Sequence, residues 1–227
     1  MASLNGFAEI VVVRHGETSW NASKIIQGHL NSELNEIGRQ QATAVAVRLS
    51  KEPQFVAIYS SDLKRAAETA EKIANSCGLP EVNFDPALRE RHLGELQGLA
   101  LRDAAKLKAE AYQCFLSKSS DQNIPGGGES LNQLYDRCTS CVERIAKKHK
   151  GERAIVVTHG GVLRELYKRA APNSKFPNGT ILNTSVNVIQ ISENGKWSIK
   201  MWGDISHLQD ISVIKSTIAE DKNFYAV

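Results

Sequence analysis

Short apolar runs alternate with longer amphipathic stretches along the chain. Residues 10–13 and 154–157 are continuously apolar, which is typical of parallel strands covered on both faces. The alternation predicts an α/β fold of three α/β/α layers with a mainly parallel central sheet. The predicted strands are residues 10–13, 55–59, 154–157, 186–191 and 197–202. The predicted helices lie near residues 36–51, 62–76, 99–117, 129–149 and 162–170.

Two segments of the chain have a different pattern. Residues 186–191 and 197–202 alternate apolar and polar side chains around residues 193–196, which predicts a hairpin at an edge of the sheet. An unpaired edge strand can pair with a second copy of the chain, so the sequence allows either a monomer or a homodimer. Residues 117–128 end in three consecutive glycines, and we expect a surface loop there, at the edge of a binding site.

Composition narrows the class of protein without naming a function. A chain of 227 residues with 41% hydrophobic side chains predicts one domain, residues 1–227, that folds without disulfides or structural metal. The net charge of +3 is too small to indicate a nucleic-acid partner. No stretch of 18 apolar residues exists, so no membrane span is predicted. No signal or transit peptide is recognisable, and we expect a cytoplasmic protein.

The four cysteines suggest no secreted disulfide framework. Cys138 and Cys141 form a Cys-x-x-Cys pair, a spacing also found in zinc and redox sites. They lie within the predicted helix 129–149, where positions three apart share a face. No second Cys or His pair accompanies them, so we expect structural thiols.

Two predicted strands are followed by the same kind of residues. His15 and Gly16 follow the first strand, and His159 and Gly160 follow strand 154–157. Ligands bind at the carboxyl ends of parallel strands, and neighbouring strands lie about 4.8 Å apart. If these strands are neighbours, the two imidazoles converge there. The glycines let the backbone approach a ligand and expose N–H groups to an anion.

The second predicted strand adds a cation to the same edge. Ser60 or Ser61 is the expected N-cap of the next helix, and Arg65 falls in its first turn. With Arg14 and the two histidines, Arg65 forms a pocket for a dianion. Phosphate suits it, because arginine forks match phosphate oxygens in pairs. A carboxylic acid is expected nearby, and residues 88–95 supply candidates.

Five ordered blocks resemble the signature of the histidine phosphatase superfamily, which includes the cofactor-dependent phosphoglycerate mutases. The first is Arg14-His15-Gly16-Glu17-Thr18, continued by Asn21 and by Gln27-Gly28. The blocks lie at residues 14–18, 60–70, 88–98, 126–130 and 158–161. The resemblance spans nearly the whole chain and extends to plant phosphoglycerate-mutase-like proteins. It implies a phosphoglycerate mutase-like fold and a reaction without metal or other cofactor.

The resemblance also implies a role for individual residues. His15 is the implied nucleophile, and Glu90 is the implied general acid and then base for water. The implied phosphate-binding residues are Arg14, Asn21, Gln27, Gly28, Arg65, His159 and Gly160. The chemistry agrees, because neutral imidazole is a nucleophile and arginines can neutralise the transferred phosphoryl oxygens.

Three departures from the mutase pattern favour a phosphatase. Mutases have a tyrosine where Leu93 stands and a substrate-binding lysine where Leu101 stands. They also have an arginine pair in a longer insert, whereas residues 118–125 are short and contain no arginine. Without those cations a second phosphate is held poorly, and water can release the first. A cofactor-dependent mutase and a non-catalytic phospho-ligand binding protein remain the alternatives.

The expected substrate is a small phosphomonoester, and its identity is weakly marked. A basic residue at the mouth can bind a carboxylate, which suits phosphoserine or a phosphorylated sugar acid. The candidate mouth residues are His92, Arg102, Lys106, Tyr112 and His207.

Overall fold

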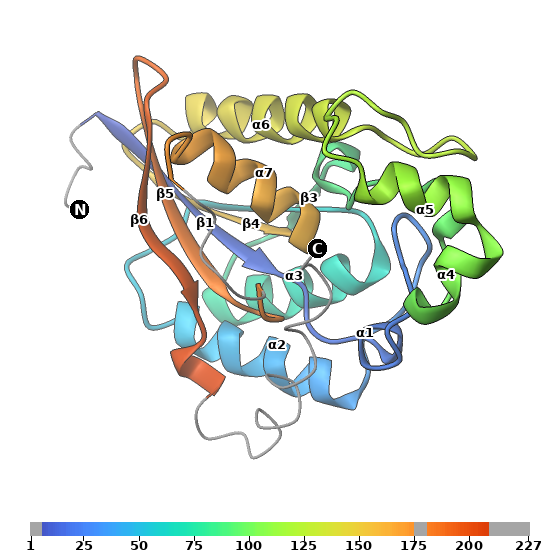
Figure 1. Ribbon diagram of the computed structural model, residues 1–227. Helices are drawn as coiled ribbons and strands as arrows, with labels where there is room; N and C mark the ends of the chain where they lie inside the picture. The colour runs from blue at the N-terminus through green and yellow to red at the C-terminus, as the bar shows by residue number, and fades with distance from the viewer. Residues whose placement is uncertain (1–5, 175–180, 209–227) are drawn as a thin grey trace.

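The computed structural model describes residues 6–174 and 181–208, and these contain one six-stranded sheet (Figure 1). The strand order is β3-β2-β4-β1-β5-β6. The strands are β1 (Phe7–Arg14), β2 (Ala57–Ser60), β3 (Val82–Phe84), β4 (Arg153–Thr158), β5 (Val186–Ser192) and β6 (Trp197–Asp204). β3, β2, β4 and β1 are parallel, whereas β5 and β6 are antiparallel to their neighbours. The predicted mainly parallel α/β fold and the edge hairpin are confirmed.

Helices cover both faces of the sheet. In Figure 1, α6 (Leu131–Lys148) and α7 (Gly160–Ala170) lie on one side, and α2 (Glu36–Leu49) and α3 (Lys64–Cys77) lie on the other. Each side has its own buried apolar cluster against the sheet. β1 and β4 contribute alternate side chains to both clusters, which explains why their sequences are apolar without a break.

The ends of these helices follow from local sequence. Asn35 accepts a hydrogen bond from the Gly38 N–H at the start of α2. Ser130 and Gln133 form a reciprocal capping box at the start of α6.

Cys138 and Cys141 are buried on α6 as free thiols, and burial raises the pKa of the Cys141 thiol to about 12. Both side chains pack in the apolar cluster on this face of the sheet, as expected for structural thiols.

A smaller layer lies beyond the carboxyl ends of the parallel strands (Figure 1). The predicted helix 99–117 is two helices, α4 (Leu101–Leu107) and α5 (Ala109–Leu116), because the backbone leaves the helical region at Lys108. With the loop carrying Ile124, they form a third apolar cluster. This layer also contains α1 (Ser19–Ala22) and the 3₁₀ turn η2 (Gly94–Leu96). The 3₁₀ turn η1 (Pro86–Leu88) packs in the cluster of α6 and α7, and a further turn is η3 (Ser206–Leu208).

Two short elements escaped prediction. β3 has three residues and α1 has four, too few to produce a hydrophobic period. None of the helices in the two described ranges is both long enough and apolar enough to span a bilayer.

Candidate active site

The two strand-end histidines lie side by side. β1 pairs with β4 in parallel, with Arg14 opposite Thr158, so the next residue of each strand end reaches the same edge. The ring centroids of His15 and His159 are 5.1 Å apart. The expectation that these strands are neighbours is therefore confirmed.

The hydrogen bond of His15 defines which ring nitrogen can react. Its Nδ1 lies 2.7 Å from the carbonyl oxygen of Gly16, which can only accept, so Nδ1 carries the proton. Nε2 then holds the lone pair. Burial, followed by the charges of Arg65 and Arg14, holds the pKa of His15 well below its usual value. The ring is neutral near pH 7, as a nucleophile must be.

His159 is arranged as a hydrogen-bond donor. Its Nε2 lies 2.8 Å from the Ser61 hydroxyl, which also accepts the Leu63 N–H. We assign the hydroxyl proton to the contact with Nε2, an assignment that places the ring proton on Nδ1. That atom is buried and has no hydrogen-bond partner among the residues the structure describes. Burial and Arg65 lower the pKa of His159 well below its usual value, so this ring is also neutral.

The Ser61 contact corrects one prediction. The N-cap of α3 is Leu63, with no side-chain cap, rather than Ser60 or Ser61. The helix begins at Lys64 because Ser61 uses its hydroxyl on the loop backbone and on His159. Arg65 lies in the first turn, as expected from the sequence.

Two buried arginines complete the basic cluster, which we define as Arg14, His15, Arg65 and His159. Arg65 is only 1% exposed and donates to the carbonyl oxygens of Leu30 (3.0 Å) and Gly28 (2.8 Å). Arg14 donates to the Ile181 carbonyl oxygen. Both guanidinium groups line the same cavity as His15. Buried positive charge in a cavity favours an anionic ligand.

The loop after β1 adds polar groups to this cavity. Asn21 accepts the Thr18 N–H through Oδ1 (3.1 Å), and Gln27 accepts the Thr18 hydroxyl through Oε1 (3.2 Å). With these oxygens engaged, each amide has an NH₂ group left for the cavity that it lines. Gly28 has φ +52°, and a Cβ there would lie 2.1 Å from the Gln97 amide oxygen. This conformation and the close approach of Gln97 both favour glycine at this position.

Glu90 is fixed by contacts at both of its ends. Its carboxylate accepts the N–H of Arg91 (2.8 Å) and of Gly161 (3.1 Å). Its carbonyl oxygen accepts Arg137 Nη2 (2.7 Å) and lies 2.6 Å from His29 Nε2. These contacts connect α7, α6 and the loop after β1 to one residue, and they hold its carboxylate in the cavity wall.

Arg137 is a site-supporting residue that sequence reasoning missed. Besides Glu90, its Nη1 donates to the carbonyl oxygens of Ala87 (2.9 Å) and Arg89 (2.7 Å). Its Nε and Nη2 both bind the Glu129 carboxylate, at 2.6 and 2.8 Å. An arginine in the predicted helix 129–149 looks like many solvated helix residues. Nothing local marks its contacts with segment 87–90.

The contact between Gly161 and Glu90 yields a prediction. A Cβ at Gly161 would lie 2.1 Å from Glu90 Oε1, so Gly161→Ala must displace the carboxylate. We expect kcat to fall about 100-fold, which a misplacement of about 1 Å can cost. Steady-state kinetics of phosphate release measures this, and the KM for substrate should change little. An unchanged kcat would mean that the position of Glu90 does not matter for the reaction.

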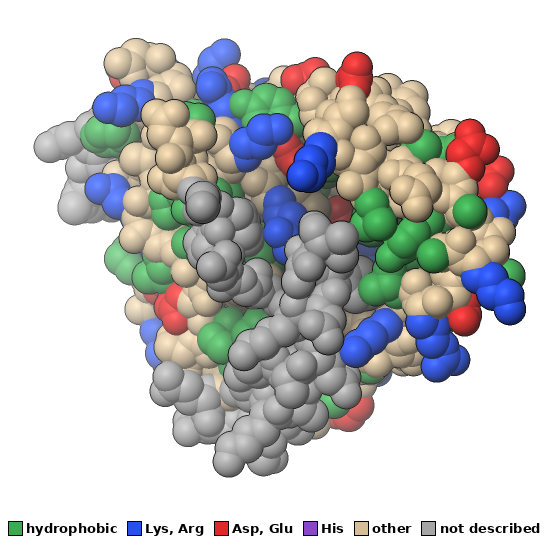
Figure 2. Space-filling view, in the orientation of Figure 1, with side chains coloured by type: hydrophobic (Ala, Val, Ile, Leu, Met, Phe, Trp, Pro, Cys, Tyr) green, Lys and Arg blue, Asp and Glu red, His purple; other side chains and the backbone are tan. Residues whose placement is uncertain are grey.

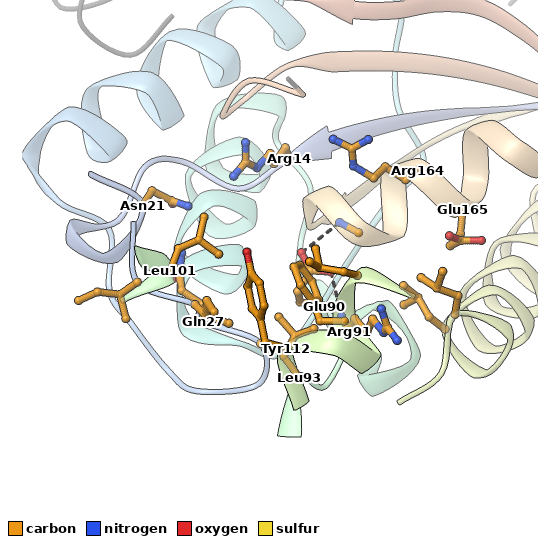
Figure 3. A pocket seen from close by; sticks show the side chains of 18 of the residues that line it. Arg14, Asn21, Gln27, Glu90, Arg91, Leu93, Leu101, Tyr112, Arg164 and Glu165 are labelled. Carbon is orange, nitrogen blue, oxygen red and sulfur yellow. Dashed lines mark hydrogen bonds between the residues drawn. The ribbon is translucent and has the colours of Figure 1, made fainter. Parts of the chain in front are cut away.

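Glu90 and the basic cluster, apart from His159, line one cavity of about 390 Å³. Figure 2 shows basic side chains around the hollow, with apolar side chains on the side of α4 and α5. In Figure 3, Glu90 lies between two walls of different character. The apolar wall includes Ile25, Ile26, Leu93, Leu101, Tyr112 and Phe115. The charged wall includes Arg91, Arg164 and Glu165.

The structure brings most of the expected residues together. Among the implied catalytic and phosphate-binding residues, those lining the cavity are Arg14, His15, Asn21, Gln27, Gly28, Arg65 and Glu90. His159 lies next to His15, and Gly160 is the first residue of α7.

Most of the expected mouth residues lie elsewhere. Tyr112 lines the cavity, but His92, Arg102, Lys106 and His207 do not. The Arg102 side chain is 88% exposed beside Asp103, because α4 turns Ala104 inward instead. His92 accepts the Gly94 N–H, and His207 contacts Thr184 and Arg48.

Comparison with known proteins identifies the family. The family description "Histidine phosphatase superfamily (branch 1)" matches residues 10–205. The chain belongs to this superfamily. The expected resemblance is thereby confirmed, and this histidine phosphatase is a hydrolase by family.

Two plant relatives resemble this histidine phosphatase over most of its length. Phosphoglycerate mutase-like protein 4 of Arabidopsis thaliana is 58% identical over 216 residues, which cover 95% of this chain and 94% of the relative. The metal-independent phosphoserine phosphatase of Arabidopsis thaliana is 54% identical over 207 residues, covering 91% and 86%.

A solved structure gives the same fold with a ligand. A mutant phosphoserine phosphatase from Entamoeba histolytica, in complex with phosphoserine, has a TM-score of 0.75 and 26% identity. The match covers 88% of this chain and 99% of the other.

Proposed function

We propose that the protein hydrolyses small phosphomonoesters without a metal ion, through a phosphohistidine at His15. The observation that carries this proposal is the His15 tautomer. A neutral imidazole donates from Nδ1 to Gly16 and turns its Nε2 lone pair to an arginine-lined cavity that also holds Glu90. This arrangement combines a nucleophile, charge neutralisation and a proton donor.

The first step forms the phosphohistidine. Nε2 of His15 attacks phosphorus, and a P–N bond forms as the ester P–O bond breaks. Arg14 and Arg65 neutralise the phosphoryl oxygens, and His159 donates from Nδ1. Protonated Glu90 gives its proton to the leaving oxygen, so the product is an alcohol.

The second step returns the enzyme to its starting state. The Glu90 carboxylate takes a proton from water, and the water oxygen attacks phosphorus. The P–N bond breaks, and its electron pair returns to His15 Nε2. Inorganic phosphate leaves, and Glu90 is protonated for the next cycle.

The apolar wall favours hydrolysis over mutase chemistry. Leu93 and Leu101 line the cavity at the positions where mutases have tyrosine and lysine. A second phosphate would face hydrocarbon there, where burying its charge is costly. One relative is named as phosphoglycerate mutase-like, so the experiment below also tests for mutase activity.

Phosphoserine and phosphorylated sugar acids are the proposed substrates. The similarity to a phosphoserine phosphatase supports the first of these. A cytosolic location is consistent with four free cysteines, two of which are the buried thiols on α6.

A panel of phosphomonoesters in excess chelator tests the proposed function. We expect phosphate release from phosphoserine and p-nitrophenyl phosphate at rates that the chelator does not change. Bisphosphate-stimulated interconversion of phosphoglycerates would instead support a mutase. Calorimetric binding of phosphate with no turnover of any ester would support a non-catalytic binding protein.

A further inference from the structure

Glu165 is a buried carboxylate that the reaction steps above do not use. It lies on α7, lines the cavity and is only 7% exposed. Its Oε2 is fully buried and accepts no hydrogen bond from the described residues. The nearest cation is Lys168 Nζ, at 3.6 Å, on a side chain that is 57% exposed. A buried carboxylate oxygen without a donor is costly, and a cationic ligand would remove that cost.

A buried cation lines the same wall. Arg91 is 7% exposed and donates from Nε to the Glu129 carbonyl oxygen at 2.9 Å. Burial raises the pKa of Glu165, while Lys168 and Arg91 oppose that rise. A carboxyl group and a guanidinium group thus line the same wall of one cavity.

The position of Glu90 links this wall to the substrate. A general acid at Glu90 must touch the leaving oxygen, so the organic part of the substrate extends past Glu90. In Figure 3, Glu165 and Arg91 lie on one side of Glu90, with Asn21 and Leu101 on the other. A zwitterionic leaving group fits the charged side, because each of its charges meets the opposite one there.

We propose that Glu165 is a specificity residue that binds the ammonium group of an amino-acid phosphomonoester. Arg91 binds the carboxylate of the same substrate. The inference rests on the proposed function and narrows its substrate class. A phosphorylated sugar acid has the carboxylate but no ammonium, and leaves Glu165 without a partner.

Four substrates separate the two charges. O-phosphoserine has both groups, phosphoethanolamine has only the ammonium, 3-phosphoglycerate has only the carboxylate, and glycerol 1-phosphate has neither. Glu165→Gln keeps the size of the side chain and removes its charge. We expect the ratio of kcat/KM for phosphoserine to that for 3-phosphoglycerate to fall about 10- to 100-fold, the usual value of a charged hydrogen bond. The ratio of phosphoethanolamine to glycerol 1-phosphate should fall by a similar factor.

Two further variants serve as controls for the effect of Glu165→Gln. Glu143→Gln removes an ion pair with Arg169, at 3.0 Å, between residues that do not line this cavity, and it should leave both ratios as in the wild type. Glu165→Asp keeps the charge and should retain part of the selectivity, even if Glu165→Gln folds poorly.

The outcomes distinguish the two proposals. Unchanged ratios in Glu165→Gln would overturn the role of Glu165 and leave the phosphatase intact. Where that variant does not fold, a wild type that hydrolyses 3-phosphoglycerate as well as phosphoserine would overturn it. No turnover of any ester by the wild type, p-nitrophenyl phosphate included, would overturn the proposed function itself.

Discussion

His15→Ala should abolish turnover of every phosphomonoester, with a fall in kcat of at least about 10⁴-fold. Removal of a covalent nucleophile has effects of this size or larger in other enzymes. The remaining basic cluster can still bind phosphate but has no atom to accept the phosphoryl group. Phosphate release measured in chelator gives the rate, and thermal unfolding shows whether the variant is folded.

A second histidine provides a matched control. His149 is buried at the opposite end of β4, where its Nε2 lies 2.9 Å from the Tyr59 hydroxyl. His149→Gln should retain full activity. Residual turnover by His15→Ala near the wild-type rate would mean that water or another side chain attacks phosphorus.

Glu90→Gln should depend strongly on the leaving group. For alkyl esters such as phosphoserine, kcat/KM should fall about 10²- to 10⁴-fold, the usual contribution of general acid catalysis. For p-nitrophenyl phosphate it should fall much less, because nitrophenolate leaves without a proton. Release of the phosphoryl group from His15 still needs a base, so nitrophenolate should appear in a burst. Stopped-flow absorbance measures both phases.

Glu95 provides the control for this variant. It is exposed and forms an ion pair with Lys108, at 2.8 Å. Glu95→Gln should therefore leave the kinetics unchanged. An equal loss in kcat/KM for alkyl and aryl esters in Glu90→Gln would show that Glu90 supports the structure of the site and transfers no proton in the first step.

Much of this site is predictable from sequence because it is built on strand ends. His15 and His159 each follow an unbroken apolar run, and parallel strands bring such ends together. Arg65 is predictable because it lies in the first turn of the helix after a third parallel strand. Regular elements convert sequence spacing into position, so these three residues meet without any knowledge of loops.

The residues outside this framework were harder to predict. Arg102 and Arg91 are both arginines near the predicted acid, yet only Arg91 lines the cavity. Arg102 points to solvent because α4 turns Ala104 into the third apolar cluster. The sequence pattern does not reveal which face of α4 is buried there. Arg137 donates hydrogen bonds to backbone carbonyl oxygens of a distant segment. Every residue has such a carbonyl, so the sequence does not indicate which ones accept. Glu165 is recognised only from the structure, where its buried Oε2 accepts no hydrogen bond from the described residues.

In the proposed mechanism the phosphoryl group passes through His15. Glu90→Gln enzyme mixed with p-nitrophenyl phosphate should accumulate this intermediate, because its hydrolysis lacks the base. Quenching in alkali, which preserves phosphohistidine, followed by mass spectrometry of the peptides locates the group. We expect one phosphoryl group on His15, formed at the rate of the nitrophenolate burst. The double variant His15→Ala/Glu90→Gln should carry none. A burst with no phosphoryl group on His15, or with one on another residue, would contradict the mechanism.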